Sequence, residues 1–357
     1  MLLELRKMVK VGLIGCGMVA HLHMKAYKAM KDVQVVAVAD VDIKRAEAFA
    51  KPYRINKAFS NYFELFDLKD LAFVDICTPT STHEAIVRDA AKARVNVLME
   101  KPMGRASAEC ERMIEEAKKH KIQLCICHNQ LFYPHVQHLK AIADSEGFNL
   151  TSFRTSHREN FEWLKAHNLA QPWNVNPEHG GILWEVGTHL AYLQLYFLKD
   201  IKEVYAIGAK NRYSVWDDFI VLLRTSSQRW GILEISWVAQ ESEIVYEVIG
   251  STGRRVQTYL PHGYIIERMK ESPADLSGVL SNFLSDQARL FKKWTKFMKD
   301  QIKKPTLGHF KLIRSYVNSI QSGTTPPVTG EDGRNAVKLL ECIKESLDER
   351  KPVSYSA

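Results

Sequence analysis

One glycine-rich turn limits what this chain can fold into more than any other stretch. Residues 9–14 form a short apolar strand that leads into the sequence GCGMVA, where a helix begins. In this G-x-G-x-x-A pattern, Gly15 permits a tight turn, Gly17 lets backbone N–H groups approach a pyrophosphate, and Ala20 lets the helix pack closely on its strand. The helix N-terminus then attracts phosphate. The cofactor contacts predicted from this turn are Gly15, Cys16, Gly17, Met18, Val19 and Ala20.

A second apolar strand supports the prediction of a dinucleotide site. Residues 33–39 end at Asp40, which lies 25 positions after Gly15 (40 − 15 = 25). A Rossmann unit places there the acid that binds the ribose hydroxyls. A carboxylate at that point repels a 2′-phosphate, so we predict NAD in preference to NADP, although Lys44 and Arg45 could soften the preference. The alternative interpretation makes Asp40 the N-cap of a helix that begins at Ile43.

Strands and helices alternate after Asp40, as a parallel sheet with crossover helices requires. The sequence predicts helices at 43–51, 62–66, 84–93 and 108–120, and strands at 73–77, 95–99 and 122–127. We expect these elements to complete a six-stranded, doubly wound α/β sheet. Ligands of such sheets bind beyond the carboxyl ends of the strands. The residues at those ends include Gly15, Asp40, Thr78, Lys101 and His128.

The pattern changes near residue 147, where strands begin to follow one another directly. They are predicted at 150–157, 204–209, 219–224, 231–237, 245–249 and 255–259, with one helix at 182–198 among them. This order predicts an α+β domain with a large, mainly antiparallel sheet. A chain of 357 residues exceeds one comfortable core. We therefore place a Rossmann domain at 1–128 and a substrate-binding and oligomerisation domain at 129–357. Helices are predicted at 310–321 and 335–347, the last packing back toward the first domain.

The charge balance has a local explanation. Lys and Arg outnumber Asp and Glu by 49 to 41, which gives a formal net charge of +8. Much of the excess lies in and beside a predicted amphipathic helix at 276–298, whose lysines alternate with a bulky apolar stripe. We expect that stripe to face the core or a second subunit, and membrane association is the weaker alternative. No nucleic-acid motif accompanies the basic residues, so we predict no nucleic-acid partner.

The cysteines and the start of the chain indicate a cytoplasmic setting. The six cysteines contain no C-x-x-C pair and several lie in apolar strands, which predicts buried free thiols. Residues 1–8 do not look like a signal peptide, and no apolar run reaches 18 residues. The histidines show no metal-ligand spacing, so we predict no metal.

Three residues have the chemistry of a proton-transfer site. Glu185 and His189 are four positions apart on a predicted helix, so the carboxylate could orient the imidazole as a general base. The alternative is a purely structural pair. Lys101 follows a sheet strand at the cofactor edge, where it could donate a proton or stabilise charge. The nearby histidines of this edge are His83, His128 and His179.

Several motifs in this order resemble the glucose–fructose oxidoreductase, inositol dehydrogenase and rhizopine catabolism (Gfo/Idh/MocA) family. They are GCGMVA at 15–20, TPTSTH at 78–83, EKP at 100–102, GGILWEVGTH at 180–189 and GEDGRNA at 330–336. The resemblance covers nearly the whole chain. It implies a Rossmann domain, a sheet-based second domain that commonly forms oligomers, and NAD(P)-dependent oxidation or reduction of a sugar, polyol or nucleotide sugar.

The resemblance also assigns roles to single residues. Lys101 matches the family's active-site lysine and His189 its catalytic histidine. Glu185 stands where an aspartate is more usual, Tyr192 where another aspartate is often found, and Leu131 where an arginine is common, so the expected pocket is less charged. Further cofactor contacts are expected at Thr78, Pro79, His83, Glu100 and Lys101. Substrate contacts are expected at Asn129, Trp173 and Tyr192.

Three functions follow from these observations. The first is a dehydrogenase that acts on CH–OH groups, in which His189 takes the hydroxyl proton, Glu185 holds His189, and Lys101 hydrogen-bonds the same oxygen. The second is a sugar-modifying enzyme that oxidises its substrate transiently and recycles NAD. The third is a cofactor-binding regulator without activity, which the presence of Lys101 and His189 disfavours. We expect a homo-oligomer, either a dimer or a tetramer.

Overall fold

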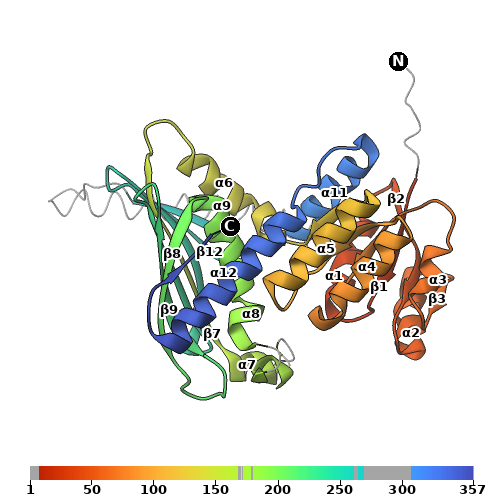
Figure 1. Ribbon diagram of the computed structural model, residues 1–357, viewed down its shortest axis with the longest axis horizontal. Helices are drawn as coiled ribbons and strands as arrows, with labels where there is room; N and C mark the ends of the chain where they lie inside the picture. Colours follow the sequence, from red (N-terminus) through yellow and green to blue (C-terminus); the bar gives the residue numbers. More distant parts are fainter. Residues whose placement is uncertain are drawn as a thin grey trace. The chain divides into compact units, whose positions relative to one another are not determined.

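The computed structural model describes residues 8–167, 170, 172–177, 180–260, 264–268 and 307–356 (Figure 1). The predicted helix at 276–298 and His179 lie outside these ranges. The chain forms two compact units, which are described in turn. The first comprises Met1–Phe132 with Thr306–Val337, and the second comprises Tyr133–Pro305 with Lys338–Ala357.

The first unit contains the six-stranded parallel sheet that the sequence predicts. The order is β3-β2-β1-β4-β5-β6, with strands β1 Val9–Ile14, β2 Val33–Ala39, β3 Ala58–Phe59, β4 Leu71–Ile76, β5 Asn96–Met99 and β6 Leu124–Ile126. Consecutive residues of β4, β5 and β6 are buried, so the middle of this sheet is covered on both faces. The sequence predicts six strands but places only five of them; it does not locate β3, because a strand of two residues has too little pattern.

Helices cross between the strands of this sheet. They are α1 Met18–Lys28, α2 Ile43–Tyr53, α3 Phe63–Phe66, α4 His83–Lys92 and α5 Ser107–His120, with short 3₁₀ turns η1 Thr80–Thr82 and η2 Asn129–Phe132. The order of strands reverses between β1 and β4, so a topological switch point lies at their carboxyl ends. That edge is where a doubly wound sheet binds its ligand.

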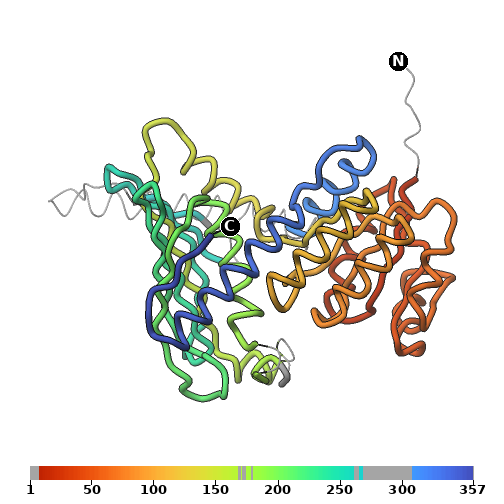
Figure 2. The backbone as a smooth tube through the Cα atoms, viewed as in Figure 1, coloured from red at the N-terminus to blue at the C-terminus, as the bar shows by residue number. Residues whose placement is uncertain are grey.

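Helix α11, Leu307–Ser322, returns to the first unit from late in the chain (Figure 2). The Arg314 guanidinium donates to both carboxylate oxygens of Asp32, at 2.9 and 2.6 Å. The buried Tyr316 hydroxyl donates to the Val97 carbonyl at 3.0 Å, and the Tyr316 ring packs on Phe73. The boundary predicted after residue 128 does not anticipate this return.

The second unit contains an eight-stranded sheet in the order β13-β12-β11-β7-β10-β9-β8-β14. Its strands are β7 Leu150–Asn160, β8 Ile201–Ala209, β9 Asp218–Thr225, β10 Trp230–Ser236, β11 Val238–Gly250, β12 Arg255–Leu260, β13 Tyr264–Arg268 and β14 Val353–Ser354. Strands β7 and β10 pair in parallel and the other pairs are antiparallel. The α+β class with a mainly antiparallel sheet is thus confirmed, and β13 and β14 are additions to the prediction.

The two faces of this sheet differ. Helix α9, Gly187–Leu198, packs on one face, where Phe197 stacks on Phe153 and Gln194 donates to the Ile232 carbonyl at 3.0 Å. Strand β9 alternates strictly between exposed and buried residues, which indicates that its other face is open to solvent. The exposed apolar residues of this open face are Ile207, Ile220, Leu222 and Trp230.

The single helix predicted at 182–198 is wrong. The structure divides it into α8, Gly181–Glu185, and α9, with Val186 between them. Gly181 has a φ of +64°, and a Cβ there would lie 2.8 Å from Val215, so this entry requires glycine. The remaining helices of the unit are α6 Pro134–Ala143, α7 Phe161–Ala166, η3 Pro172–Val175 and the later turns of α12 Gly330–Glu349. Within the described ranges, every helix is too short or too polar to cross a membrane.

Candidate active site

The glycine turn has the geometry of a phosphate-binding loop. Gly15 has a φ of +91°, and a Cβ there would lie 2.7 Å from the Cys77 carbonyl oxygen, so no other residue fits. A Cβ at Gly17 would meet no protein atom within 4 Å, which leaves that side of the backbone open to a ligand. Ala20, in the first turn of α1, is fully buried. The three small residues therefore have the separate roles that a dinucleotide loop requires.

Asp40 is held beside this loop. Its carboxylate accepts hydrogen bonds from the Cys16 N–H at 2.9 Å and the Asp42 N–H at 3.0 Å, and the Arg45 guanidinium lies 3.2 Å away. The N-cap of α2 is Asp42, which accepts from the N–H groups of Lys44 and Arg45. The alternative that Asp40 caps this helix is therefore wrong. Asp40 stays available at the carboxyl end of β2, with Arg45 as its cationic neighbour.

The residues after β4 form a hydrogen-bonded turn at the carboxyl end of the same sheet. The Thr82 hydroxyl bonds the Thr78 hydroxyl at 2.7 Å and the Pro79 carbonyl at 2.8 Å. The ring nitrogens of His83 lie 3.0 Å from the Thr78 carbonyl and 3.2 Å from the Met103 carbonyl. Burial lowers the pKa of His83, so the ring is neutral and donates to one carbonyl at a time. His83 thus ties this turn to the segment that follows β5.

Glu100 and Lys101 follow β5 directly, and Lys101–Pro102 is a cis peptide bond. The Glu100 N–H donates to the Ile76 carbonyl at 2.9 Å, and one Glu100 carboxylate oxygen accepts from the Lys101 N–H at 3.1 Å. Burial works against ionisation of Glu100, but the hydrogen bond and positive charge of His23 outweigh it and hold its pKa well below the usual range. Lys101 is half-buried beside this carboxylate.

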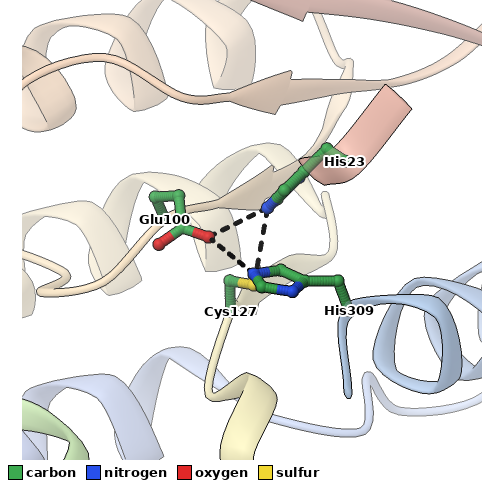
Figure 3. A group of neighbouring side chains, drawn as sticks. All are labelled: His23, Glu100, Cys127 and His309. Atoms are coloured by element: carbon green, nitrogen blue, oxygen red, sulfur yellow. Dashed lines mark hydrogen bonds and ion pairs between the residues drawn. The ribbon is translucent and has the colours of Figure 1, made fainter. Parts of the chain in front are cut away.

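His23 is a member of this edge that sequence reasoning missed. It lies on α1 and is buried against the Glu100 carboxylate, as Figure 3 shows. Its ring also meets Asp75 of β4, and the Tyr27 hydroxyl donates to the same Asp75 oxygen at 2.7 Å. A signal was present in the sequence, because His23 falls on the inward face of α1 with Ala20, Met24 and Tyr27.

His309 of α11 lies beneath the carboxyl ends of the strands, next to Asn129 and Glu100. Its Nε2 lies 3.3 Å from the Asn129 side-chain nitrogen and 3.9 Å from Glu100. Burial, reinforced by the charge of His23, lowers the pKa of His309 to about 4. Burial likewise lowers the pKa of His128 to about 3. Both rings are therefore neutral at pH 7, and Asn129, expected at the substrate, is buried beside one of them.

Four donor atoms in this region lie close enough together to be considered for a metal ion. They come from His23, Glu100, Cys127 and His309, and all lie within 4.8 Å of one another. The His23 nitrogens, however, lie 2.7 and 2.9 Å from carboxylate oxygens, distances that fit an N–H group between each pair. Burial also raises the pKa of the Cys127 thiol well above its ordinary value. The arrangement favours bound protons over a metal.

The second unit contains the other group of predicted residues. Glu185 ends α8 and is exposed, whereas His189 lies in the first turn of α9 and is half-buried. The His189 Nδ1 lies 2.7 Å from the Tyr192 hydroxyl, and the two rings meet edge to face. Tyr192, expected at the substrate, is thus a hydrogen-bond partner of His189. Orientation of His189 by Glu185 stays a prediction. Contact with substrate at Trp173 also stays a prediction, because the structure describes the backbone of this residue in η3 but not its side chain.

Comparison with known proteins decides the family. Residues 9–128 match the oxidoreductase family with an NAD-binding Rossmann fold, and residues 137–256 match the GFO/IDH/MocA C-terminal domain. The chain belongs to the GFO/IDH/MocA family of oxidoreductases. The family suggested by the sequence motifs is confirmed, and so is the assignment as an NAD-dependent enzyme.

The proteins that this chain resembles include dehydrogenases named for different substrates. Myo-inositol 2-dehydrogenase of Thermotoga maritima is 25% identical over 97% of this chain and 98% of its own length. Trans-1,2-dihydrobenzene-1,2-diol dehydrogenase of Bos taurus is 31% identical over 69% of this chain and 71% of its own. The WlbA dehydrogenase of Bordetella pertussis, crystallised with NADH and UDP-GlcNAcA, is 17% identical, has a TM-score of 0.81, and aligns over 98% of this chain and 99% of its own. Its likeness supports the fold.

The residues of the GFO/IDH/MocA fingerprint fit NAD. The open side of Gly17 admits a pyrophosphate beside the α1 N-terminus, and the Asp40 carboxylate can accept from ribose hydroxyls. Bound NAD supplies a nicotinamide that accepts hydride. The candidate residues thus form two groups: a cofactor edge with Lys101 in the first unit, and the pair His189 and Tyr192 in the second.

Proposed function

We propose that this chain is an NAD-dependent dehydrogenase that transfers hydride between the nicotinamide and a carbinol carbon of a sugar, polyol, inositol or nucleotide sugar. The observation that carries the proposal is the Glu100–Lys101 corner, which presents a half-buried lysine at the carboxyl edge of the NAD-binding sheet. The relatives' names, which include an inositol dehydrogenase and a diol dehydrogenase, support a substrate with a CH–OH group.

The proposed roles follow from the acidity of each group. The ordinary pKa values of histidine and lysine are about 6.5 and 10.4, so at pH 7 His189 is the better proton acceptor and Lys101 the better cation. His189 takes the hydroxyl proton while the Lys101 ammonium stabilises the developing alkoxide. The Tyr192 hydroxyl, 2.7 Å from Nδ1, orients the ring of His189. Their action at one site is inferred from the family motifs.

The open face of the eight-stranded sheet supports a homo-oligomer. Ile207 pairs with Ile220 across β8 and β9, and Leu222 pairs with Ile232 across β9 and β10, so apolar side chains lie in adjacent rows. A contiguous exposed apolar patch of this kind typically marks an interface. A second copy of the chain is the proposed partner at this patch.

We also propose a cytoplasmic setting, because all six cysteines are free thiols.

A substrate screen with two variants tests the enzyme proposal. Neutral sugars, inositols and nucleotide sugars are each incubated with NAD at several pH values while NADH absorbance is followed. For any compound that the wild type oxidises, the kcat of Lys101→Ala should be about 10²–10⁴-fold lower. The kcat of Lys10→Ala, a substitution on the surface of the same unit, should equal that of the wild type. Wild-type rates in Lys101→Ala would overturn the site. NAD binding without turnover of any compound would favour the regulator.

A further inference from the structure

The buried His23 has no part in the proposed chemistry, yet its contacts are those of a cation. Its side chain is 0% exposed, with Nδ1 2.7 Å from Asp75 and Nε2 2.9 Å from Glu100. An ionised carboxylate can only accept hydrogen bonds, so each ring nitrogen must donate. An imidazole that donates from both nitrogens is protonated. The ring is thus a fixed positive charge between two negative ones.

Burial keeps the thiols, the phenol and the second histidine around the ring uncharged. The titratable groups that face the ring come from five segments: Tyr27 on α1, Asp75 and Cys77 at the end of β4, Glu100 after β5, Cys127 after β6, and His309 on α11. Lys101 lies beside Glu100. Burial raises the pKa of Cys77 to about 12 and keeps Tyr27 protonated, and His309 is neutral. Burial opposes the charge of His23, but Asp75 and its other partners raise its pKa well above the ordinary value.

Glu100 connects this charge to Lys101. A carboxylate is a planar group, so fixing one oxygen also fixes the direction of the other. The His23 Nε2 binds Oε1 of Glu100, and Oε2 accepts from the Lys101 backbone N–H at 3.1 Å. A chain of two hydrogen bonds therefore runs from α1 to the backbone of Lys101, and Figure 3 shows the first of them, between His23 and Glu100.

We propose that His23 is a positioning residue, which fixes the Glu100 carboxylate and, through it, the backbone of Lys101. The inference rests on the proposed hydride transfer for its effect on rate. Without the cation, the Glu100 carboxylate would be buried with its negative charge unpaired. Such a group takes up a proton or turns toward solvent, because an unpaired buried charge is costly. Either change weakens the hydrogen bond that holds Lys101.

Two variants separate positioning from mere packing. His23→Asn and Tyr27→Phe each remove one hydrogen bond to Asp75, but only the first frees Glu100. Because displacement of a catalytic group by about 1 Å can cost about 10²-fold, kcat should fall by about 10–100-fold in His23→Asn and stay within about threefold in Tyr27→Phe. NAD affinity should change by less than about threefold in both, since Gly17 and Asp40 are untouched.

A spectroscopic measurement on the wild type needs no substrate and no variant. Nitrogen NMR of protein labelled with ¹⁵N-histidine should show both ring nitrogens of His23 protonated at pH 7 and still protonated at pH 8. A singly protonated ring at pH 7 would overturn the inference even if His23→Asn does not fold. Equal kcat in the two variants, with normal wild-type turnover, would overturn the positioning role alone. Absence of wild-type turnover with every compound would overturn the proposed function and the positioning role together.

Discussion

The two units each bury a histidine, and the two rings titrate in opposite directions. His23 of the first unit lies between two carboxylates, which raise its pKa well above the ordinary value although burial opposes the charge. His135 of the second unit lies in the first turn of α6, its Nε2 has no hydrogen-bond partner among the residues that the structure describes, and burial lowers its pKa to about 4. Burial by itself therefore does not decide the charge of a histidine. The neighbouring acceptors decide it.

The same contrast extends to the candidate site. The cofactor edge of the first unit is held by buried hydrogen bonds to Glu100 and Asp75, so its residues also support the fold. In the second unit Glu185 is exposed and His189 is half-buried, so their removal disturbs little packing. We expect substitutions in the second unit to damage chemistry alone, and substitutions in the first to damage stability or cofactor binding as well.

The largest expected effect is on the rate of the proposed reaction. His189→Ala should lower kcat by about 10²–10⁴, the usual contribution of a general base, while the melting temperature and NAD affinity stay close to wild type. Glu185→Gln, which keeps the shape of the side chain, should lose less. Steady-state kinetics with calorimetry measures both quantities. A large loss of stability with an unchanged kcat would reverse the contrast between the units.

The next effect concerns acid stability. A histidine whose folded pKa is lowered stabilises the fold above its free pKa of about 6.5, and that stability is lost as the pH falls toward about 4. Removing this group in His135→Phe should therefore flatten the fall in unfolding free energy between pH 7 and pH 4 by up to about 3 kcal/mol. Urea titrations at each pH provide the measurement. The lowered pKa values of His309 and His128 in the first unit also reduce stability at acid pH, so part of the decrease in unfolding free energy should remain in the variant. If the unfolding free energy of His135→Phe depends on pH as that of the wild type does, His135 does not contribute.

Two neighbouring aspartates sharpen the distinction between binding and folding within the first unit. Asp40→Asn should weaken NAD binding about 10–100-fold and reduce the preference over NADP, because a charged hydrogen-bond partner of the ribose is lost. Asp42→Ala should instead cost about 1 kcal/mol of stability as a helix cap and leave the preference intact. Titrations with both cofactors would detect either result. If Asp40→Asn keeps the wild-type preference, Arg45 outweighs the carboxylate.

The smallest effect tests the open sheet face. Leu222→Asp should raise the dissociation constant of the proposed oligomer at least about tenfold, which is about 1.4 kcal/mol. Phe63→Asp is a matched control, because Phe63 of the first unit is also 49% exposed, the same fraction as Leu222. Light scattering over a dilution series measures the assembly state. A wild-type monomer of 40.9 kDa at micromolar concentration would contradict the proposed interface.

The features that could be predicted from the sequence are those that depend on residues close together in the chain. The strand at 33–39 and the glycine turn depend on neighbouring residues, and the structure has them at the predicted positions. The break at Val186 was not predicted, although Gly187 directly follows it. The partners of His23 could not be found by spacing, because Asp75, Glu100 and His309 become neighbours only when three distant segments fold together. The hydrogen bond between His189 and Tyr192 joins residues three positions apart and could have been predicted from the spacing, but the sequence analysis assigned Glu185 as the partner of His189 instead.

The return of α11 has a consequence for the order in which the protein is made. Residues 133–306 separate Phe132 from Leu307, so 174 residues (306 − 132 = 174) are synthesised before α11 emerges. At about 5–20 residues per second, that interval lasts about 9–35 seconds. During it, the nascent first unit has no Tyr316 to cover Phe73 and no Arg314 to pair with Asp32. A ribosome-bound chain that ends before residue 307 therefore carries an exposed apolar surface that chaperones can recognise, and the first unit, although its synthesis begins first, stays incomplete until most of the second unit has been made.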